Sequence, residues 1–234
     1  MGADLAGTAA LIASPARALM LDCLLTGEAM SASELSKFAG VAPSTGSEHL
    51  GALLAGGLIR VEINGRHRYF SLAGPPVAEA LEALALISSS SPVGSLRQGL
   101  AADRLRFARS CYDHLAGILG VAVLDTLRSN RWLELRDGDC SLTVIGERGL
   151  IRLGVDVDGA RRSRRAFSRL CLDWTERRHH LAGALGANLM RTMMDRGWVR
   201  RPSSGRAFEL TRSGVSGLLT LGLPDMILGS DSRC

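Results

Sequence analysis

Residues 31–72 read SASELSKFAGVAPSTGSEHLGALLAGGLIRVEINGRHRYFSL and contain the most informative pattern of the chain. Ser31 followed three residues later by Glu34 is a capping box, which predicts a short helix that ends at Gly40. After a turn, a second helix is predicted over about residues 43–55, with leucines on its inner face and short polar side chains on its first turns. Two helices joined in this way form a helix-turn-helix pattern, whose second helix can present polar groups to base edges and phosphates.

A β-hairpin is predicted directly after the second helix. Leu58–Ile63 reads as a strand, Asn64-Gly65 is the strongest short hairpin signal, and Arg66–Leu72 reads as the returning strand. A hairpin in this place is a wing, and cationic side chains at its tip suit a minor groove or a row of phosphates, although a merely solvated tip is the alternative. The candidate DNA contacts are Ser44, Thr45, Ser47 and His49 on the second helix and Arg66, His67 and Arg68 on the wing.

With these motifs in place, residues from about Leu5 to Ile87 resemble the winged-helix domain of the ArsR family of bacterial transcription regulators. The resemblance covers a little over a third of the chain. It implies a homodimer that binds an imperfect palindrome in double-stranded DNA and leaves it when an inducer binds. Many members of that family sense metals through Cys ligands in the helix before the recognition helix, or through Asp and His ligands along the last helix of the domain. Ser33–Ser36 contains no thiol and Val77–Leu84 contains no histidine, so we expect no metal sensing at those positions.

Length and composition predict a soluble cytoplasmic protein with two domains. A chain of 234 residues can bury two cores of ordinary size. Its hydrophobic content of 46% includes no apolar run near 18 residues in length, and its N-terminus lacks the basic start of a signal peptide. The five cysteines have no paired spacing, so free thiols are expected rather than disulfides.

The predicted domains are residues 1–92, for DNA binding and dimerisation, and residues 97–234, for sensing an effector. Polar, breaker-rich Ser88–Gly94 is the predicted linker between them. The net charge of +5 is unevenly divided, because residues 1–96 carry 5 basic and 8 acidic side chains and residues 97–234 carry 23 and 15. The basic excess therefore lies outside the part that resembles a DNA-binding domain.

The second domain contains an internal repeat. The segment from His114 to Gly120, HLAGILG, recurs as HLAGALG from His180 to Gly186, and a tryptophan recurs at the same offset of 66. Each copy, over about residues 111–154 and 177–222, reads as a helix that begins near the histidine, a β-hairpin and a closing helix. We therefore predict a mainly α fold with small β-hairpin wings (α+β), in which a winged helix-turn-helix precedes two winged-helix-like halves. A ligand cavity is expected at the seam between these halves.

Polar side chains near that seam form a candidate effector pocket. A buried histidine bonded to backbone is the simpler interpretation of each repeated histidine, and a pocket is the alternative. Cys111-x-x-His114 on one helix face could also chelate zinc or a similar metal. Since Arg177 aligns with Cys111 in the repeat, a symmetric metal site is excluded, and further ligands would have to come from elsewhere. The candidate pocket residues are Cys111, Tyr112, His114, Cys171, Asp173, Trp174, His179 and His180, among which Cys111, His114 and Cys171 are the candidate metal ligands.

A second echo, Arg109-x-Cys111-x-Asp113 and Arg169-x-Cys171-x-Asp173, is shifted by six residues against the main repeat. An arginine close to a thiol lowers its pKa and can make it reactive, so thiol-redox sensing is an alternative to metal sensing.

Arginines also gather later in the second domain. Arg161, Arg165 and Arg169 fall on one predicted helical stripe. A solvated helix face, an anionic effector site and a supplementary contact to the DNA backbone are the three interpretations of this stripe.

Together these patterns predict a sequence-specific DNA-binding transcriptional regulator, a homodimeric repressor that is released by a small-molecule or metal effector in its C-terminal domain. No cofactor is required. The rival hypothesis is an enzyme in which Cys111 is the nucleophile and His114 the base. We see no oxyanion-hole loop, glycine-rich phosphate loop or pair of catalytic carboxylates in the sequence, so we do not expect an enzyme.

Overall fold

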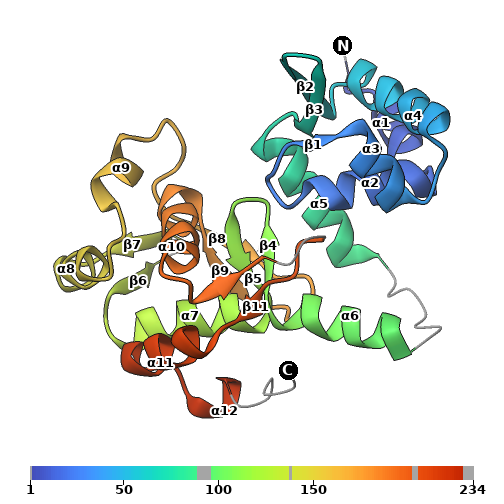
Figure 1. The fold of residues 1–234 in the computed structure, drawn as a ribbon. Helices are drawn as coiled ribbons and strands as arrows, with labels where there is room; N and C mark the ends of the chain where they lie inside the picture. The colour runs from blue at the N-terminus through green and yellow to red at the C-terminus, as the bar shows by residue number, and fades with distance from the viewer. Residues whose placement is uncertain (1, 89–95, 137–138, 202–204, 229–234) are drawn as a thin grey trace. The chain divides into compact units, whose positions relative to one another are not determined.

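The computed structural model of the chain is shown in Figure 1. It divides into two compact units, residues 1–85 and residues 86–234, which we treat separately. The predicted linker lies, apart from Ser88, outside the described residues. The structure describes residues 2–88, 96–136, 139–201 and 205–228.

The N-terminal unit is a winged helix-turn-helix, as predicted. Its elements are α1 (Leu5–Ile12), α2 (Pro15–Leu24), β1 (Met30–Ser31), α3 (Ala32–Ala39), α4 (Pro43–Ala55), β2 (Ile59–Asn64), β3 (His67–Leu72) and α5 (Pro75–Ile87). Ser31 and Glu34 form the predicted capping box at the start of α3, and Gly40 ends that helix in the left-handed conformation with φ of 69°. The strands form one antiparallel sheet in the order β1-β3-β2.

The core of this unit explains why α3 and α4 keep their relative position. Leu35 of α3 and Leu50 and Leu53 of α4 are almost fully buried. Gly46 of α4 lies against Ser36 of α3, where an added Cβ would fall 1.9 Å from the Ser36 Oγ. The absence of a side chain at Gly46 therefore lets the two helices of the motif approach closely.

The turn of the wing differs by one position from the turn that the Asn-Gly dipeptide predicted. In the register of β2 and β3, Asn64 pairs with His67, so the two loop residues are Gly65 and Arg66. Gly65 has a φ of 60°. A glycine with positive φ at the first loop position suits the right-handed twist of the flanking strands. Arg66 thus lies in the turn itself and not in the returning strand.

The C-terminal unit consists of helix α6 (Leu96–Phe107) followed by two halves of the same design, each with a hairpin, a helix, a second hairpin and a closing helix. The first half comprises β4 (Arg109–Cys111), β5 (His114–Ala116), α7 (Gly117–Ser129), β6 (Leu133–Arg136), β7 (Asp139–Leu142) and α8 (Val144–Arg152). The second comprises β8 (Arg169–Leu172), β9 (His179–Ala182), α10 (Gly183–Asp195), β10 (Val199–Arg200), β11 (Glu209–Leu210) and α11 (Arg212–Leu221). Short α9 (Val157–Arg162) lies between the halves in sequence, and α12 (Asp225–Leu228) follows them.

The repeated tryptophan and glycines stabilise the junction between the second hairpin and the closing helix. In the first half, Thr143 caps α8 and accepts a hydrogen bond from the Gly146 N–H. Cβ atoms added at Gly146 and Gly149 would fall 2.1 Å from the Trp132 carbonyl oxygen and 2.4 Å from its ring. The closing helix can lie directly on the tryptophan only because these positions lack side chains. In the second half the corresponding residues are Thr211, Gly214, Gly217 and Trp198.

The prediction that a helix begins near each repeated histidine was wrong by three residues. His114 is the first residue of β5 and His180 the second of β9. Helices α7 and α10 begin at Gly117 and Gly183, whose φ values are 81° and 79°. Added Cβ atoms there would fall 2.5 Å from the Arg106 carbonyl oxygen and 2.8 Å from the Ala166 carbonyl oxygen. The two histidines therefore lie on strands, across from the preceding strand of their hairpin.

The predicted arginine stripe was also wrong. Helix α9 ends at Arg162, Arg165 lies in the connection that follows, and Arg169 begins strand β8. Arg161 and Arg165 are engaged in ion pairs, with Glu147 and Asp113 respectively. A continuous stripe of arginines spaced one turn apart is thus not formed.

No single helix among the described residues is long and apolar enough to cross a membrane. Helices α1 and α2 reach that length and composition only as a pair, and they are bent by 88°.

Candidate nucleic-acid interface and candidate metal centre

The first turns of α4 present the predicted polar side chains at the surface of the N-terminal unit. Ser44 and Ser47 are exposed, while Thr45 and His49 are half-buried. The Ser47 hydroxyl donates a 2.9 Å hydrogen bond to the Pro43 carbonyl of its own helix, so its Oγ retains acceptor capacity. Because the N-terminus of a helix carries a partial positive charge, this end of α4 can accept a phosphate as well as a base edge.

The tip of the wing exposes the side chains that were predicted as cationic or hydrogen-bond-donating groups. Arg66, His67 and Arg68 are all exposed. The Arg68 guanidinium lies 5.5 Å from the centre of the Phe70 ring, which restricts its position along β3. At the base of the wing, Arg60 of β2 donates a hydrogen bond of 2.9 Å to Ser71 Oγ of β3. These contacts support a defined wing whose tip carries exposed arginines.

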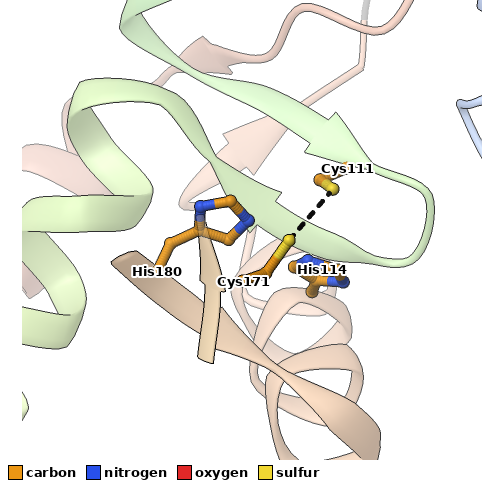
Figure 2. A group of neighbouring side chains, drawn as sticks. All are labelled: Cys111, His114, Cys171 and His180. Atoms are coloured by element: carbon orange, nitrogen blue, oxygen red, sulfur yellow. Dashed lines mark hydrogen bonds between the residues drawn. The ribbon is translucent and has the colours of Figure 1, made fainter. Parts of the chain in front are cut away.

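In the C-terminal unit the first hairpins of the two halves bring two cysteines and two histidines together (Figure 2). Cys111 and His114 are direct cross-strand partners in β4–β5, and Cys171 and His180 are direct partners in β8–β9. One ligand atom from each of the four side chains lies within 4.8 Å of the others. The two Sγ atoms are 3.8 Å apart. We call these four residues the Cys/His cluster.

The cluster is built symmetrically, which corrects the alignment that matched Arg177 with Cys111. Cys171 follows Cys111 by 60 residues, whereas His180 follows His114 by 66. The difference arises because two residues connect the cysteine to the histidine in the first hairpin and eight do so in the second. Arg177 lies in that longer connection. The shift of six between the two sequence echoes is therefore a loop insertion, and each hairpin contributes one thiol and one imidazole.

Glycines let the two halves cross closely at the cluster. An added Cβ at Gly120 of α7 would lie 3.5 Å from the His180 Cβ, and one at Gly186 of α10 would lie 3.4 Å from the His114 Cβ. Each repeated histidine thus packs against the helix of the opposite half. This reciprocal contact explains why both the histidine and the glycine recur in the sequence.

Both histidines are buried and incompletely satisfied. His114 is 7% exposed and His180 is 0% exposed. In the part of the chain that the structure describes, His114 Nε2 and both ring nitrogens of His180 are buried without a hydrogen-bond partner. The simpler interpretation, in which each buried histidine is bonded to backbone, is therefore not what the structure shows for either residue.

The chemistry of the cluster favours a thiolate beside an imidazole. Although burial lowers the pKa of His114, its hydrogen bond with Asp113 and the nearby Cys171 raise it to about 9. The Cys111 thiol and the imidazoles of His114 and His180 hold the pKa of Cys171 far below its ordinary value, against the effect of burial. A thiolate is the form of cysteine that binds metals and attacks electrophiles.

Asp173, predicted as part of the pocket, holds the two halves together beside the cluster. Its carboxylate lies 3.0 Å from the Arg109 guanidinium, and both side chains are completely buried. Asp173 Oδ2 also accepts a 2.7 Å hydrogen bond from the Gly117 N–H at the start of α7, and Oδ1 accepts three more from Thr175 and Glu176. Burial raises the pKa of Asp173, but the charge of Arg109 and these hydrogen bonds lower it well below its ordinary value.

The remaining predicted pocket residues surround the cluster less closely. Tyr112 lies in the β4–β5 turn with φ of 61°, and His179 is exposed on β9. The Trp174 ring lies 4.6 Å from the Arg109 guanidinium. In the sequence, Arg109 stands out only as part of the repeated Arg-x-Cys-x-Asp pattern, which did not predict its buried ion pair with Asp173.

A separate hollow of about 940 Å³ is lined in part by the closing helices α8 and α11, and its lining includes matched residues of both halves. Its lining residues are Asn130, Trp132, Gly149, Arg152, Leu153, Arg196, Trp198, Ser216, Gly217, Thr220, Leu221 and Gly222.

Some similarities to known proteins are confined to the helix-turn-helix region of this chain, and another extends over nearly its full length. The family described as "Helix-turn-helix domain" matches residues 12–62. The "Uncharacterized HTH-type transcriptional regulator YdfF" of Bacillus subtilis (strain 168) is 40% identical over 214 residues, which are 92% of this chain and 95% of that protein.

Among solved structures, NolR from Sinorhizobium fredii is 31% identical with a TM-score of 0.34, over 37% of this chain and 85% of that one. The homodimeric DNA-binding domain of Mb0332 from Mycobacterium bovis, a possible ArsR-family transcriptional regulator, is 26% identical with a TM-score of 0.33, over 36% of this chain and 76% of that one.

The relation to YdfF spans nearly the whole of both proteins, so this chain belongs to the family of helix-turn-helix transcriptional regulators. It is a DNA-binding regulator whose N-terminal unit has the winged form. This confirms the class of protein that residues 31–72 predicted.

Proposed function

We propose that this regulator binds an imperfect palindrome in double-stranded DNA as a homodimer, and that it is a repressor released by an effector bound in its C-terminal unit. Helix α4 would enter the major groove, and the wing would contact the neighbouring backbone or minor groove. The observation that carries the proposal is the exposed polar first turn of α4 in the same unit as a cationic wing tip. Since its partner is DNA, we place the protein in the cytoplasm.

The surface of α1 supports the homodimer. None of its eight residues is buried, although the helix has the apolar sequence LAGTAALI. Leu5 is 77% exposed, and Leu84 of α5 is 40% exposed. Apolar helix faces that stay uncovered within their own unit mark interaction surfaces. Pairing of α1 and α5 with the same helices of a second copy would cover both, as the ArsR resemblance implies.

The proposal gives Cys111 and His114 a binding role and no catalytic one. They face each other across a hairpin, and the Cys171 thiol and the His180 imidazole complete the group. A set of two thiols and two imidazoles in one place is a ligand set, whereas a nucleophile needs only one base.

Salt dependence of DNA binding tests the wing. The probe is a duplex that the purified protein enriches from a randomised library, compared with a random duplex of equal length. The double variant Arg66→Ala, Arg68→Ala should weaken binding to both, and the log-log salt slope should fall by about 1 for each lost phosphate contact. Arg60→Ala at the base of the wing is the matched control and should leave the slope unchanged. An unaltered slope in the double variant would exclude the wing from the DNA backbone.

Sequence discrimination tests α4. Ser44→Ala or Thr45→Ala should weaken binding to the enriched duplex more than binding to the random duplex, because base contacts carry sequence information and phosphate contacts do not. Equal losses on both duplexes would place these hydroxyls on phosphates. If no duplex is enriched and none is bound, the proposed function itself fails.

A further inference from the structure

We propose that Cys111, His114, Cys171 and His180 bind one divalent cation of the zinc class, and that this cation is the effector of the C-terminal unit. The second part of this inference, that the cation is the effector, rests on the proposed function, because an effector can release the protein from DNA only if the protein binds DNA. The cluster lies in the C-terminal unit, whereas the family's usual metal positions lie in the winged helix.

The spacing of the ligand atoms fits a tetrahedral site. With zinc–sulfur bonds of about 2.3 Å, two thiolates of one tetrahedral ion lie about 3.8 Å apart. The Sγ atoms of Cys111 and Cys171 are 3.8 Å apart. All four ligand atoms lie within 4.8 Å of one another, so their separations need to shorten by at most about 1.5 Å to complete the site.

The unsatisfied histidines distinguish a metal site from a plain pair of thiols. A buried nitrogen without a hydrogen-bond partner lowers stability, so native structures rarely leave several in one place. His114 Nε2 and His180 Nε2 are in this state in the described part of the chain, and His180 Nδ1 has only its ion-pair contact with Asp173. A disulfide between Cys111 and Cys171 would leave these nitrogens as they are, whereas a cation would use one nitrogen of each ring.

The neighbouring carboxylates indicate which nitrogen of each ring would bind. His114 Nδ1 lies 3.2 Å from Asp113 Oδ1, and His180 Nδ1 lies 3.4 Å from Asp173 Oδ2. A carboxylate at Nδ1 orients the ring and leaves Nε2 for the metal, which is the usual arrangement around metal-binding histidines. In each half of the C-terminal unit this Asp follows the cluster cysteine by two residues.

The charges around the site balance a divalent cation. Two thiolates neutralise the charge of the ion, and the imidazoles bind as neutral ligands, so binding releases two protons from the cluster to solvent. Each neighbouring carboxylate already has its own arginine, Arg165 for Asp113 and Arg109 for Asp173. The carboxylates therefore orient the histidines without adding uncompensated negative charge.

A cation here would connect the two halves of the unit to the helix that follows the linker. Cys111 ends β4, which begins two residues after the end of α6, and Cys171 lies in the first hairpin of the second half. Binding would fix β4 against β8–β9 and so restrict the strand that continues directly from α6.

Metal binding is tested on the full-length protein, reduced and treated with a chelator. We expect native mass spectrometry to show one Zn²⁺ per chain, with a mass that corresponds to loss of two protons. We also expect Co²⁺ to give the visible bands and the thiolate charge-transfer band of a tetrahedral site. Cys171→Ser and His180→Ala should each lower Zn²⁺ affinity roughly 100-fold or more. Cys140→Ser, which removes a buried thiol outside the cluster, is the matched control and should bind as the wild type does.

Three results would overturn the metal site: no Zn²⁺ binding by the reduced wild type, binding that survives both cluster variants, or binding lost in Cys140→Ser as well. Rapid formation of a Cys111–Cys171 disulfide in a protein that binds no metal would identify a thiol switch instead.

The effector role is tested separately by anisotropy with the enriched duplex. Apo protein should bind the duplex, and Zn²⁺ should weaken binding at least tenfold in the wild type and in Cys140→Ser but not in His180→Ala. If the metal binds and the DNA affinity stays the same, the cation is not the effector. Binding of DNA by apo protein that takes no metal would overturn this inference and leave the proposed function intact.

Discussion

The buried Asp173–Arg109 pair allows a stability prediction whose size follows from the structure. Both side chains are completely buried, and the charged atoms are 3.0 Å apart. Removing one partner of such a pair leaves an uncompensated buried charge and costs about 3–5 kcal/mol. Asp173→Asn keeps the shape of the side chain, but its amide NH2 must face other donors. At Oδ2 these are the Gly117 N–H and the Arg109 guanidinium, and at Oδ1 they are the Thr175 and Glu176 N–H groups. We therefore expect the C-terminal unit to lose at least about 3 kcal/mol of stability.

Urea unfolding followed by tryptophan fluorescence measures this loss, because all three tryptophans, Trp132, Trp174 and Trp198, lie in the C-terminal unit. A chelator keeps metal binding from contributing. With a urea dependence of about 1–3 kcal/mol/M, the midpoint should fall by about 1 M or more.

The matched control is Asp125→Asn, since Asp125 pairs with Arg178 at the surface and is 35% exposed. That variant should lose about 0–1 kcal/mol. Adding Arg109→Met to Asp173→Asn should restore part of the loss, because it removes the uncompensated charge. Equal destabilisation by Asp173→Asn and Asp125→Asn would refute the reasoning, as would a double variant no more stable than the single one.

Three further predictions concern packing, protonation and thiol reactivity. Gly149→Ala should destabilise the C-terminal unit by about 1–3 kcal/mol in the same fluorescence assay, because its Cβ would fall 2.4 Å from the Trp132 ring; unchanged stability would mean that the ring can move away. The Ser31 hydroxyl and N–H lower the pKa of Glu34. The Glu34 carboxylate therefore stabilises α3 fully when the pH is above its unfolded pKa of about 4.3, and this stabilisation is lost as the pH falls through the lower pKa of the folded state. Hydrogen exchange over α3 should accordingly be faster in Glu34→Gln than in the wild type at pH 7, and the same in both near pH 3. Burial, with a smaller effect of Asp22, raises the pKa of Cys23 to about 11, so iodoacetamide followed by mass spectrometry should leave this thiol unmodified in folded protein at pH 7; fast labelling would contradict its burial.

The winged helix-turn-helix could be predicted from the sequence because its determinants are local. The capping box at Ser31 and Glu34 uses groups three residues apart, and Gly40 ends α3 through its own backbone conformation. The wing needed only two strand patterns and a glycine between them. Even here the turn moved by one residue, because strand register and not the dipeptide decides which residues form the loop.

The repeat in the second unit was also visible in the sequence, and the four cluster residues were among the predicted pocket residues, but their symmetric pairing in two hairpins was not predicted. Repeated glycines and tryptophans showed that two halves exist. The side chains from His114 onward are apolar enough to read as a helix, and only the tertiary contacts at Gly117 show why the helix starts three residues later. The predicted arginine stripe was wrong for a similar reason. It assumed one helix from Arg161 to Arg169, whereas α9 ends at Arg162.

The sequence by itself thus determined the regulatory class, the two-fold repeat and the residue types available for a site. The tertiary structure alone decided that Cys111, His114, Cys171 and His180 meet. A hairpin places each thiol opposite its imidazole, and the six-residue insertion in the second hairpin hides this equivalence from any comparison at constant offset. The two halves then pack closely at Gly120 and Gly186. This packing brings Cys111 and Cys171, which are 60 residues apart in the sequence, to a distance of 3.8 Å between their sulfur atoms.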